Sequence, residues 1–292
     1  MLGISSQFES LKSYLQFYGL EFEDAQVEHS FLEFKTTGFN LAGHIFQPRE
    51  HKGIVLAVHG YLSHCGLISH LIRYVVKQGY AAACFDLPGH GLSGGSRAAI
   101  EDFSQYSEAL RDFAEILKLH IDGPKYLIGH SLGGGIIADY LLSGQGREFK
   151  SVTLAAPLVR CAFWKMSKCG YRLNSFLKLD VPWVYMKTSS DAEFMKFIRY
   201  KDKLHGRYVP AQWVEALYRW NKKMEKTEAV KREINILQGD IDISVDWKYN
   251  IEFLQSKFAG TQVCFIKNGR HELFNEAAAI RSDVLSKTGE WL

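Results

Sequence analysis

Short apolar runs alternate with amphipathic stretches along most of the chain. The segments 67–77 and 103–119 carry apolar residues at i, i+3 and i+4 with charges between them, as amphipathic helices do. Six apolar runs of strand length occur around them. They are residues 53–59, 80–86, 125–129, 151–155, 234–238 and 263–266. Strands that alternate with helices predict an α/β fold, in which a mostly parallel sheet has helices on both faces.

The first part of the chain has a different pattern. Residues 27–36 and 40–47 show partial alternation of apolar and polar positions around Thr37-Gly38, which predicts an antiparallel hairpin. Residues 1–26 precede this hairpin, and we predict that they form an N-terminal helical extension packed on the core.

Between residues 157 and 232 the regular alternation stops. This segment is too long for an ordinary loop, so we predict an inserted helical cap, with the core formed by residues 27–156 and 233–292. The chain has no internal repeat and no linker rich in proline or glycine. We therefore expect the cap to be packed on the core rather than tethered to it.

The composition is that of a folded globular protein, with 292 residues of which 47% are apolar and 23% charged. The longest apolar runs are far shorter than the roughly 20 residues that a membrane helix needs. The N-terminus lacks a basic start followed by an apolar core, and acidic residues enter at Glu9, so we predict a cytoplasmic protein. The net charge of +3 is too small to imply a nucleic-acid partner.

The cysteines argue against a disulfide framework and against a zinc site, because their number is odd and no close CxxC pair occurs. We expect reduced thiols, mostly buried in strands. The five are Cys65, Cys84, Cys161, Cys169 and Cys264.

A nucleophile motif follows the third of the apolar runs. Residues 126–133 read YLIGHSLG, so that an apolar strand leads through G-x-S-x-G into an apolar helix. The glycines allow a sharp turn, because side chains two positions either side of Ser131 would clash with neighbouring backbone. Ser131 then lies at the head of a helix, where backbone N–H groups favour developing negative charge. His130 is expected to be a packing residue rather than the base.

An oxyanion hole needs a second N–H donor from the loop after an early strand. The run 53–58 ends in His59-Gly60-Tyr61, where glycine lets the backbone approach the site closely. We predict that the N–H of Tyr61 pairs with that of Leu132 to hold the oxyanion. Three residues near these loops are expected to anchor loops rather than to take part in the chemistry: His64, Asp86 and His90.

The acid and the base should follow the nucleophile in the order Ser, acid, His. After the run 234–238, the G-x-x-D spacing favours Asp242 as the acid, whereas Asp240 lies within the turn and Asp246 is expected to cap the next helix. Of the 11 histidines only His271 lies after this acid in the chain. His271 is thus predicted to deprotonate Ser131, with Asp242 stabilising the imidazolium and a covalent acyl-enzyme forming. No metal or organic cofactor is needed.

Together these motifs resemble, in order, those of the monoacylglycerol lipase and lysophospholipase family of serine aminopeptidase-like α/β hydrolases. The resemblance runs from about residue 27 to the end and implies an eight-stranded fold, ester cleavage and lipid-like acyl substrates. The chain departs from the family in Leu132, where Met is frequent, and in its first 26 residues, which have no obvious counterpart. The motifs are HGYLSHCG, FDLPGHGLSGG, GHSLGG, LAAPLV, LQGDIDISVD, NGRHELFNE and, in the cap, DKLHGRYVPAQWVEAL.

The cap is basic and aromatic. Between residues 157 and 232 there are 17 Lys or Arg against 7 Asp or Glu, a balance of +10, and 13 of the 39 aromatic residues, including Trp164, Trp183, Trp213 and Trp220. Such a surface suits peripheral contact with an anionic membrane, at the inner face of a membrane in a cytoplasmic protein. A solvated basic face over an aromatic core explains the same composition equally well.

We therefore expect a serine hydrolase that acts on a lysophospholipid or a monoacylglycerol. One alternative is a soluble carboxylesterase or peptidase that acts on small substrates. Another is a non-catalytic binding protein that kept the fold, although such proteins usually lose a triad residue and all three positions are filled here. The acyl chain, the head group and the oligomeric state are left open.

Overall fold

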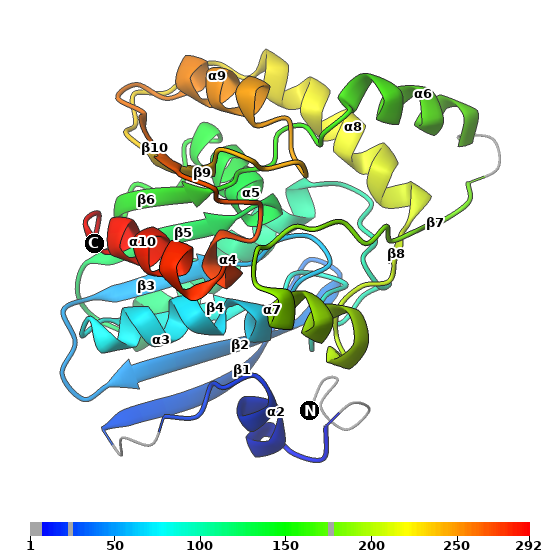
Figure 1. The fold of residues 1–292 in the computed structure, drawn as a ribbon. Coiled ribbons are helices and arrows are strands. Elements are labelled where there is room, and N and C mark those ends of the chain that lie inside the picture. Colours follow the sequence, from blue (N-terminus) through cyan, green and yellow to red (C-terminus); the bar gives the residue numbers. More distant parts are fainter. Residues whose placement is uncertain (1–7, 23–25, 175–177) are drawn as a thin grey trace.

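The computed structural model describes residues 8–22, 26–174 and 178–292. Its main feature is an eight-stranded sheet with the strand order β1-β2-β4-β3-β5-β6-β9-β10 (Figure 1). The predicted hairpin and the six predicted strands all belong to this sheet. The strands are β1 (Val27–Thr36), β2 (Phe39–Pro48), β3 (Ile54–Val58), β4 (Ala81–Phe85), β5 (Lys125–His130), β6 (Phe149–Ala155), β9 (Asn235–Gly239) and β10 (Gln262–Ile266).

The sheet is antiparallel at one end and parallel in the rest. β1 pairs with β2 around the predicted turn, where Thr36 lies opposite Phe39 and Gly38 has φ +81°. β2 is also antiparallel to β4, whereas every later pairing, from β4 with β3 to β9 with β10, is parallel. The prediction of a mostly parallel eight-stranded sheet is confirmed.

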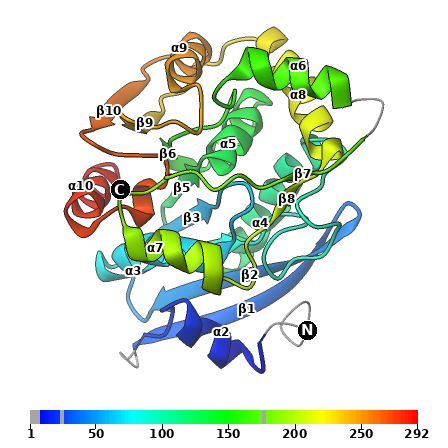
Figure 2. The same ribbon diagram turned by 45° about the vertical axis from the view of Figure 1, so that its right-hand side comes forward.

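Helices cover both faces of the sheet (Figures 1 and 2). On β3 the side chains of Ile54, Leu56 and Val58 join one buried cluster and those of Val55 and Ala57 join another, because successive residues of a strand point to opposite faces. This explains why the central strands read as continuous apolar runs. Within the described ranges, no helix combines the length and apolar character needed to cross a membrane. The first cluster packs against α4 (Ser104–His120), α5 (Leu132–Leu142) and α9 (Trp247–Lys257), and the second against α3 (Ser69–Lys77) and α10 (Ala278–Gly289).

The N-terminal part contains a short helix, α2 (Leu11–Phe17). It begins with a capping box in which Ser10 and Ser13 exchange side-chain and backbone hydrogen bonds. Tyr14 of this helix is fully buried and stacks on His44 of β2, with ring centroids 5.3 Å apart. Residues 1–7 and 23–25 of the predicted extension lie outside the described residues.

The segment predicted as a cap enters and leaves the sheet at neighbouring strands, since β6 pairs directly with β9. Trp164, Trp213 and Trp220 are buried in the same apolar cluster as α4 and α5, so they contribute to the interior rather than to a surface. The boundaries at residues 157 and 232 stay a prediction, and residues 175–177 lie outside the described part. The segment contains α6 (Trp164–Asn174), β7 (Val181–Pro182), α7 (Ala192–Lys196), the π-helical turn η2 (Phe197–Lys201), β8 (Tyr208–Val209) and α8 (Ala211–Lys226).

The expectation that the cysteines are mostly buried in strands is wrong. Only Cys84 is both buried and in a strand, while Cys65 is buried in the 3-10 helix η1 (Cys65–Ile68) and Cys264 is half-buried in β10. Cys161 is half-buried in a loop and Cys169 is exposed on α6. A thiol is small and only weakly polar, so it fits a strand, a helix or a loop, and residue type alone does not decide its place.

Candidate active site

Ser131 lies at the sharp turn between β5 and α5, as the motif predicts. Its φ of +51° is left-handed, a conformation that a non-glycine residue adopts only when its surroundings hold it. Its N–H donates to the carbonyl of Ala155 over 2.9 Å, which ties the turn to β6. A Cβ atom at Gly133 would lie 2.2 Å from the carbonyl oxygen of Val58, and one at Gly129 would lie 2.6 Å from the backbone of Gly133. Both glycines are therefore required by close backbone approach.

The three predicted triad residues meet, although they come from three separate loops. Nε2 of His271 lies 2.9 Å from Oγ of Ser131, and Nδ1 of the same ring lies 2.8 Å from Oδ2 of Asp242. Because the carboxylate can only accept, Nδ1 carries the ring proton and Nε2 is left to accept from the serine hydroxyl. All three residues are more than nine-tenths buried. This arrangement can remove a proton from Ser131 and hold the charge that results.

Opposing effects set the pKa values of Asp242 and His271. Burial by itself raises the pKa of Asp242, but His271 and hydrogen bonds from Ser244 and Gln238 outweigh it, and the net pKa is lowered. Burial by itself lowers the pKa of His271, but Asp242 outweighs it, and the net pKa is raised. The pair thus favours an ionised carboxylate and stabilises a protonated imidazole.

The other two carboxylates after β9 lie where the sequence predicts. Asp240 is exposed in the turn, and Asp246 caps α9 by accepting from the N–H of Tyr249. Gln238 was not anticipated: its side-chain amide donates to Oδ2 of Asp242 over 3.2 Å and holds the carboxylate toward His271. The feature of the sequence that could have indicated this role is a polar glutamine within the apolar run of a predicted parallel strand.

The loop that carries His271 is held by two buried side chains. Nε2 of His130 donates to the carbonyl of His271 over 2.9 Å, which agrees with the packing role predicted for His130. The N–H of Arg270 donates over 2.6 Å to Glu276, which is fully buried. Glu276 also accepts from the N–H of Ser190 over 2.6 Å and so connects this loop to the cap. Nothing in the local sequence pattern indicates this role of Glu276.

We call residues 59–64 the oxyanion loop. A Cβ atom at Gly60 would lie 3.2 Å from Cβ of Ser131, so this loop runs alongside the serine. Leu132 is the first residue of α5, and its N–H has no partner within the helix. Neither this N–H nor that of Tyr61 donates a hydrogen bond to any other described residue. Both are thus available to a group bound at Ser131.

The side chains predicted to anchor loops do so. Asp86 accepts from the N–H groups of Cys65 and Leu92, each over 2.7 Å. His90 donates from Nδ1 to the carbonyl of Pro88 over 2.9 Å. These contacts fix the loop after β4 beside the oxyanion loop. The anchoring of His64 involves the cap and is described below.

Comparison with known proteins gives consistent matches. The family described as serine aminopeptidase, S33, matches residues 49–278. A monoacylglycerol lipase of Mycolicibacterium smegmatis is 27% identical over 224 residues, which cover 74% of this chain and 79% of that protein. The phospholipase YtpA of Bacillus subtilis is 24% identical over 234 residues, covering 76% and 89%.

Among solved structures, a soluble variant of monoglyceride lipase from Saccharomyces cerevisiae in complex with a substrate analog superposes with a TM-score of 0.78. The two chains are 19% identical, and the match covers 93% of this chain and 96% of that one. At this identity the likeness shows a shared fold. It extends over the core and the cap together.

Proposed function

The chain belongs to the serine aminopeptidase S33 family of α/β hydrolases, and on that premise we propose that Ser131 cleaves the carboxylic ester bond of a lysophospholipid or a monoacylglycerol. The observation that carries the proposal is the line of hydrogen bonds from Asp242 through His271 to Ser131, with distances of 2.8 and 2.9 Å. A hydroxyl, a base and an orienting carboxylate in this order are what nucleophilic acyl transfer requires.

The reaction proceeds in two halves. Oγ of Ser131 attacks the ester carbonyl carbon while its proton passes to Nε2 of His271, and Asp242 stabilises the imidazolium. The carbonyl oxygen becomes an oxyanion that accepts from the N–H groups of Tyr61 and Leu132. As the carbon–oxygen bond breaks, His271 gives its proton to the leaving alcohol and an acyl-enzyme remains. Water then attacks the acyl carbon in the same way and releases the carboxylic acid.

Exposed apolar side chains near the loop after β9 are compatible with a substrate that has an acyl chain. A cavity of about 540 Å³ is lined by Phe163, Met166, Ile243 and Trp247 together with charged residues, among them Arg160, Lys165 and Lys248, and neither Ser131 nor His271 lines it. Phe163, Met166 and Ile243 are 72%, 71% and 46% exposed. Two relatives are named for lipid esters, a monoacylglycerol lipase and a phospholipase. A lipid-like acyl chain is the substrate class that fits both observations.

The cap also supports peripheral contact with an anionic membrane. Its buried tryptophans do not contribute, but other apolar side chains are exposed next to lysines in the sequence. Phe163 is followed two positions later by Lys165, Lys178 precedes Leu179, and each of these four residues is exposed. A surface that mixes lysine with exposed apolar side chains matches a negatively charged lipid interface.

The proposal is tested with a fluorophosphonate probe, which forms a covalent adduct with an activated serine. We expect a stoichiometric adduct on Ser131 by mass spectrometry and none in S131A. A set of esters of increasing acyl length then separates the substrate classes. Rising kcat/KM with chain length supports the lipid substrate, whereas falling kcat/KM favours the small-substrate esterase or peptidase. Absence of an adduct leaves a binding protein and rejects the hydrolase.

A further inference from the structure

A buried carboxylate in the cap connects the N-terminal helix to the oxyanion loop. Asp202 lies between η2 and β8 and is 5% exposed. Its Oδ2 lies 3.1 Å from Nε2 of His64, in the oxyanion loop, and its Oδ1 accepts from the hydroxyl of Tyr18, directly after α2, over 3.1 Å. The backbone N–H groups of Leu204 and His205 donate to the same Oδ1 over 2.8 and 3.1 Å. Three parts of the chain therefore meet at one side chain.

The hydrogen bonds of His64 determine which atom donates to which. The N–H of Gly66 donates to Nδ1 of His64 over 3.1 Å, so Nδ1 must be unprotonated. Nε2 then carries the proton and donates it to the carboxylate of Asp202. His64 has no free ring nitrogen left for chemistry. It is thus suited to hold the oxyanion loop in place, and Asp202 is the group that holds His64.

The oxyanion loop is a tight turn whose conformation needs support. The N–H of Ser63 donates to the carbonyl of Gly60 over 3.3 Å, and Leu62 within the turn has φ +61°, which is left-handed for a residue with a side chain. The peptide between Gly60 and Tyr61 belongs to this turn. A change in the turn therefore rotates the Tyr61 N–H, which is one of the two proposed oxyanion donors.

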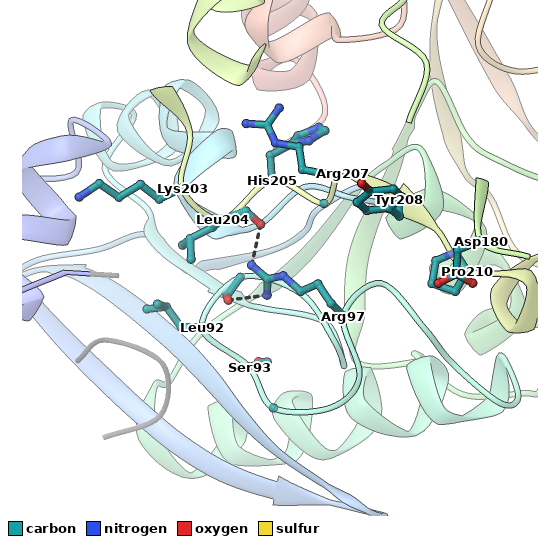
Figure 3. A pocket seen from close by; sticks show the side chains of 13 residues that line it. Leu92, Ser93, Arg97, Asp180, Lys203, Leu204, His205, Arg207, Tyr208 and Pro210 are labelled. Carbon is teal, nitrogen blue, oxygen red and sulfur yellow. Dashed lines mark hydrogen bonds between the residues drawn. The ribbon is translucent and has the colours of Figure 1, made fainter. Parts of the chain in front are cut away.

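The cap residues that follow Asp202 hold the same turn. The N–H of Gly206 donates to the carbonyl of Leu62 over 3.1 Å, and a Cβ atom at Gly206 would lie 2.4 Å from Cδ2 of Leu62. Figure 3 shows the neighbouring connection, in which Arg97 of the core donates to the carbonyl of Leu204 over 2.8 Å and to that of Gly91 over 3.0 Å. The segment 202–206 is thereby fixed to the core on both sides.

The N-terminal helix packs against the same group of residues. The Tyr18 ring lies edge-on to the His64 ring with centroids 4.8 Å apart, and a Cβ atom at Gly66 would lie 2.5 Å from Cγ of Tyr18. Phe17 contacts Phe197 of η2, with ring centroids 5.4 Å apart. Phe17 and Tyr18, at the end of the helix, therefore pack between η2 of the cap and the segment that contains His64 and Gly66.

We propose that Asp202 is a positioning residue for the oxyanion hole. We also propose that the hydrogen bond from Tyr18, at the end of the N-terminal helix, helps to hold Asp202 in place. The inference rests on the proposed function, because it concerns the same reaction at Ser131. Asp202 touches neither the substrate nor the reacting atoms. It acts through His64 on the direction of the Tyr61 N–H.

The first test is D202N. An asparagine can present only one accepting oxygen in place of two, and its NH₂ group would face a donor, either Nε2 of His64 or the N–H groups of Leu204 and His205. We expect kcat for a short soluble ester such as p-nitrophenyl butyrate to fall by about 10- to 100-fold, with KM within about threefold of wild type, because a misplaced donor weakens only the transition state.

An inhibitor distinguishes a positioning role from a merely structural one. Ser131 adds to the carbonyl carbon of a trifluoromethyl ketone and passes its proton to His271, and the ketone oxygen becomes an oxyanion in the same hole. Its Ki should rise in D202N by the same factor by which kcat falls. The Kd of the product alcohol, p-nitrophenol, should stay unchanged, because it places no oxygen in the hole.

D139N is the matched control. Asp139 is a buried carboxylate on α5 that pairs with Lys223 of the cap over 3.2 Å and accepts from Ser107 over 3.0 Å, without contact to the oxyanion loop. We expect D139N to lose thermal stability while its kcat stays within about twofold of wild type, since the weakened contacts, with Lys223 and Ser107, do not involve the oxyanion loop.

If D202N does not fold, Y18F tests the same inference, because it removes the hydroxyl that donates to Asp202 and keeps the aromatic ring packed. We expect kcat to fall severalfold with KM unchanged. The inference is overturned if D202N has the kcat of wild type, or if D202N is unfolded and Y18F has the kcat of wild type. It is also overturned if kcat falls without a matching rise in the Ki of the inhibitor. A wild-type protein that neither hydrolyses the ester nor forms the fluorophosphonate adduct overturns the proposed function itself.

Discussion

The carboxylate of Asp242 lies 2.8 Å from Nδ1 of His271, on the other side of the imidazole ring from the nucleophile. This contact raises the pKa of His271 above the ordinary histidine value of 6.5, although burial opposes the shift. Since the base works only when neutral, kcat/KM should fall on the acid side with a midpoint above pH 6.5. In D242N the midpoint should move to lower pH, because the main interaction that raises the pKa of His271 is lost and only Glu272 still opposes burial. The kcat should fall by about 10⁴, as in other serine triads.

The control for that pH profile is D246N, which changes a carboxylate of the same loop that caps α9. It should keep nearly the wild-type stability, because asparagine caps the start of a helix about as well as aspartate, and it should keep the wild-type pH profile. A midpoint that stays in place in D242N, or one that moves equally in D246N, contradicts the assignment of the acid.

Gly133 should not tolerate alanine. The added Cβ would lie 2.2 Å from the carbonyl oxygen of Val58 and 2.7 Å from that of His59, so both β3 and the oxyanion loop would have to move. We expect G133A to lose nearly all activity and several degrees in thermal midpoint. G170A on α6 is the comparison, because no described atom outside its own helix lies within 4 Å of the added Cβ, and alanine is favoured over glycine in a helix by up to about 1 kcal/mol. Equal effects of the two substitutions would refute the steric argument.

Charge reversal of exposed cap lysines should separate interfacial binding from chemistry. Lys165, Lys178 and Lys187 are exposed in the cap. Their joint replacement by glutamate should lower turnover on anionic phospholipid vesicles by at least about tenfold, because each basic residue near such a surface contributes about 1 kcal/mol. Turnover of a soluble short-chain ester should not change.

The matched variant reverses three exposed lysines of the core, Lys52, Lys77 and Lys150, and alters the net charge by the same amount. It should bind vesicles like wild type. If the two triple variants lose vesicle turnover equally, the effect is one of overall charge, and the proposed contact through the cap is wrong.

Acid should weaken the edge of the sheet at β1 and β2. Burial lowers the pKa of His29 from 6.5 to about 4, and its Nε2 lies 3.1 Å from Nδ1 of His44. Between these pH values the unfolded chain binds a proton that the folded chain does not. The free energy of unfolding therefore decreases as the pH is lowered from 6.5 to about 4, by up to about 3 kcal/mol in total. Below about pH 4 this contribution no longer changes.

This prediction is tested by measuring the free energy of unfolding of H29F with denaturant across this pH range. Phenylalanine can keep the stacking on Phe46, whose ring lies 4.6 Å from that of His29, but it binds no proton. The variant should show a shallower loss of stability toward pH 4 than wild type. Identical slopes would mean that His29 does not contribute to acid unfolding.

The strands of the core and the residues of the candidate triad could be predicted because their signals are local. The strands read as apolar runs because both faces of a parallel sheet are covered, and the elbow at Ser131 needs glycines at fixed offsets. Asp242 and His271 follow from chain order and from their place after a strand. None of these inferences depends on which segments far apart in the chain come into contact.

The residues that the sequence analysis missed act across long separations. Asp202 contacts His64 138 positions away, and Glu276 contacts Ser190 86 positions away. Periodicity does not report such pairs, because it describes only the face that a residue occupies. The cap tryptophans show a related limit, since the amphipathic ring of tryptophan suits a core as well as a membrane surface, and only packing decides between them.

The direct pairing of β6 with β9 makes the cap interchangeable in principle. The chain leaves one strand and returns on its immediate neighbour, with Thr153 opposite Asn235, so the order of the sheet does not depend on what lies between. The strand order alone would therefore accept a segment of another length, but the loop of His271 would lose the contact between Glu276 and Ser190. A replacement segment would have to supply that contact, and also a group that holds the turn after β3, as Asp202 does through His64.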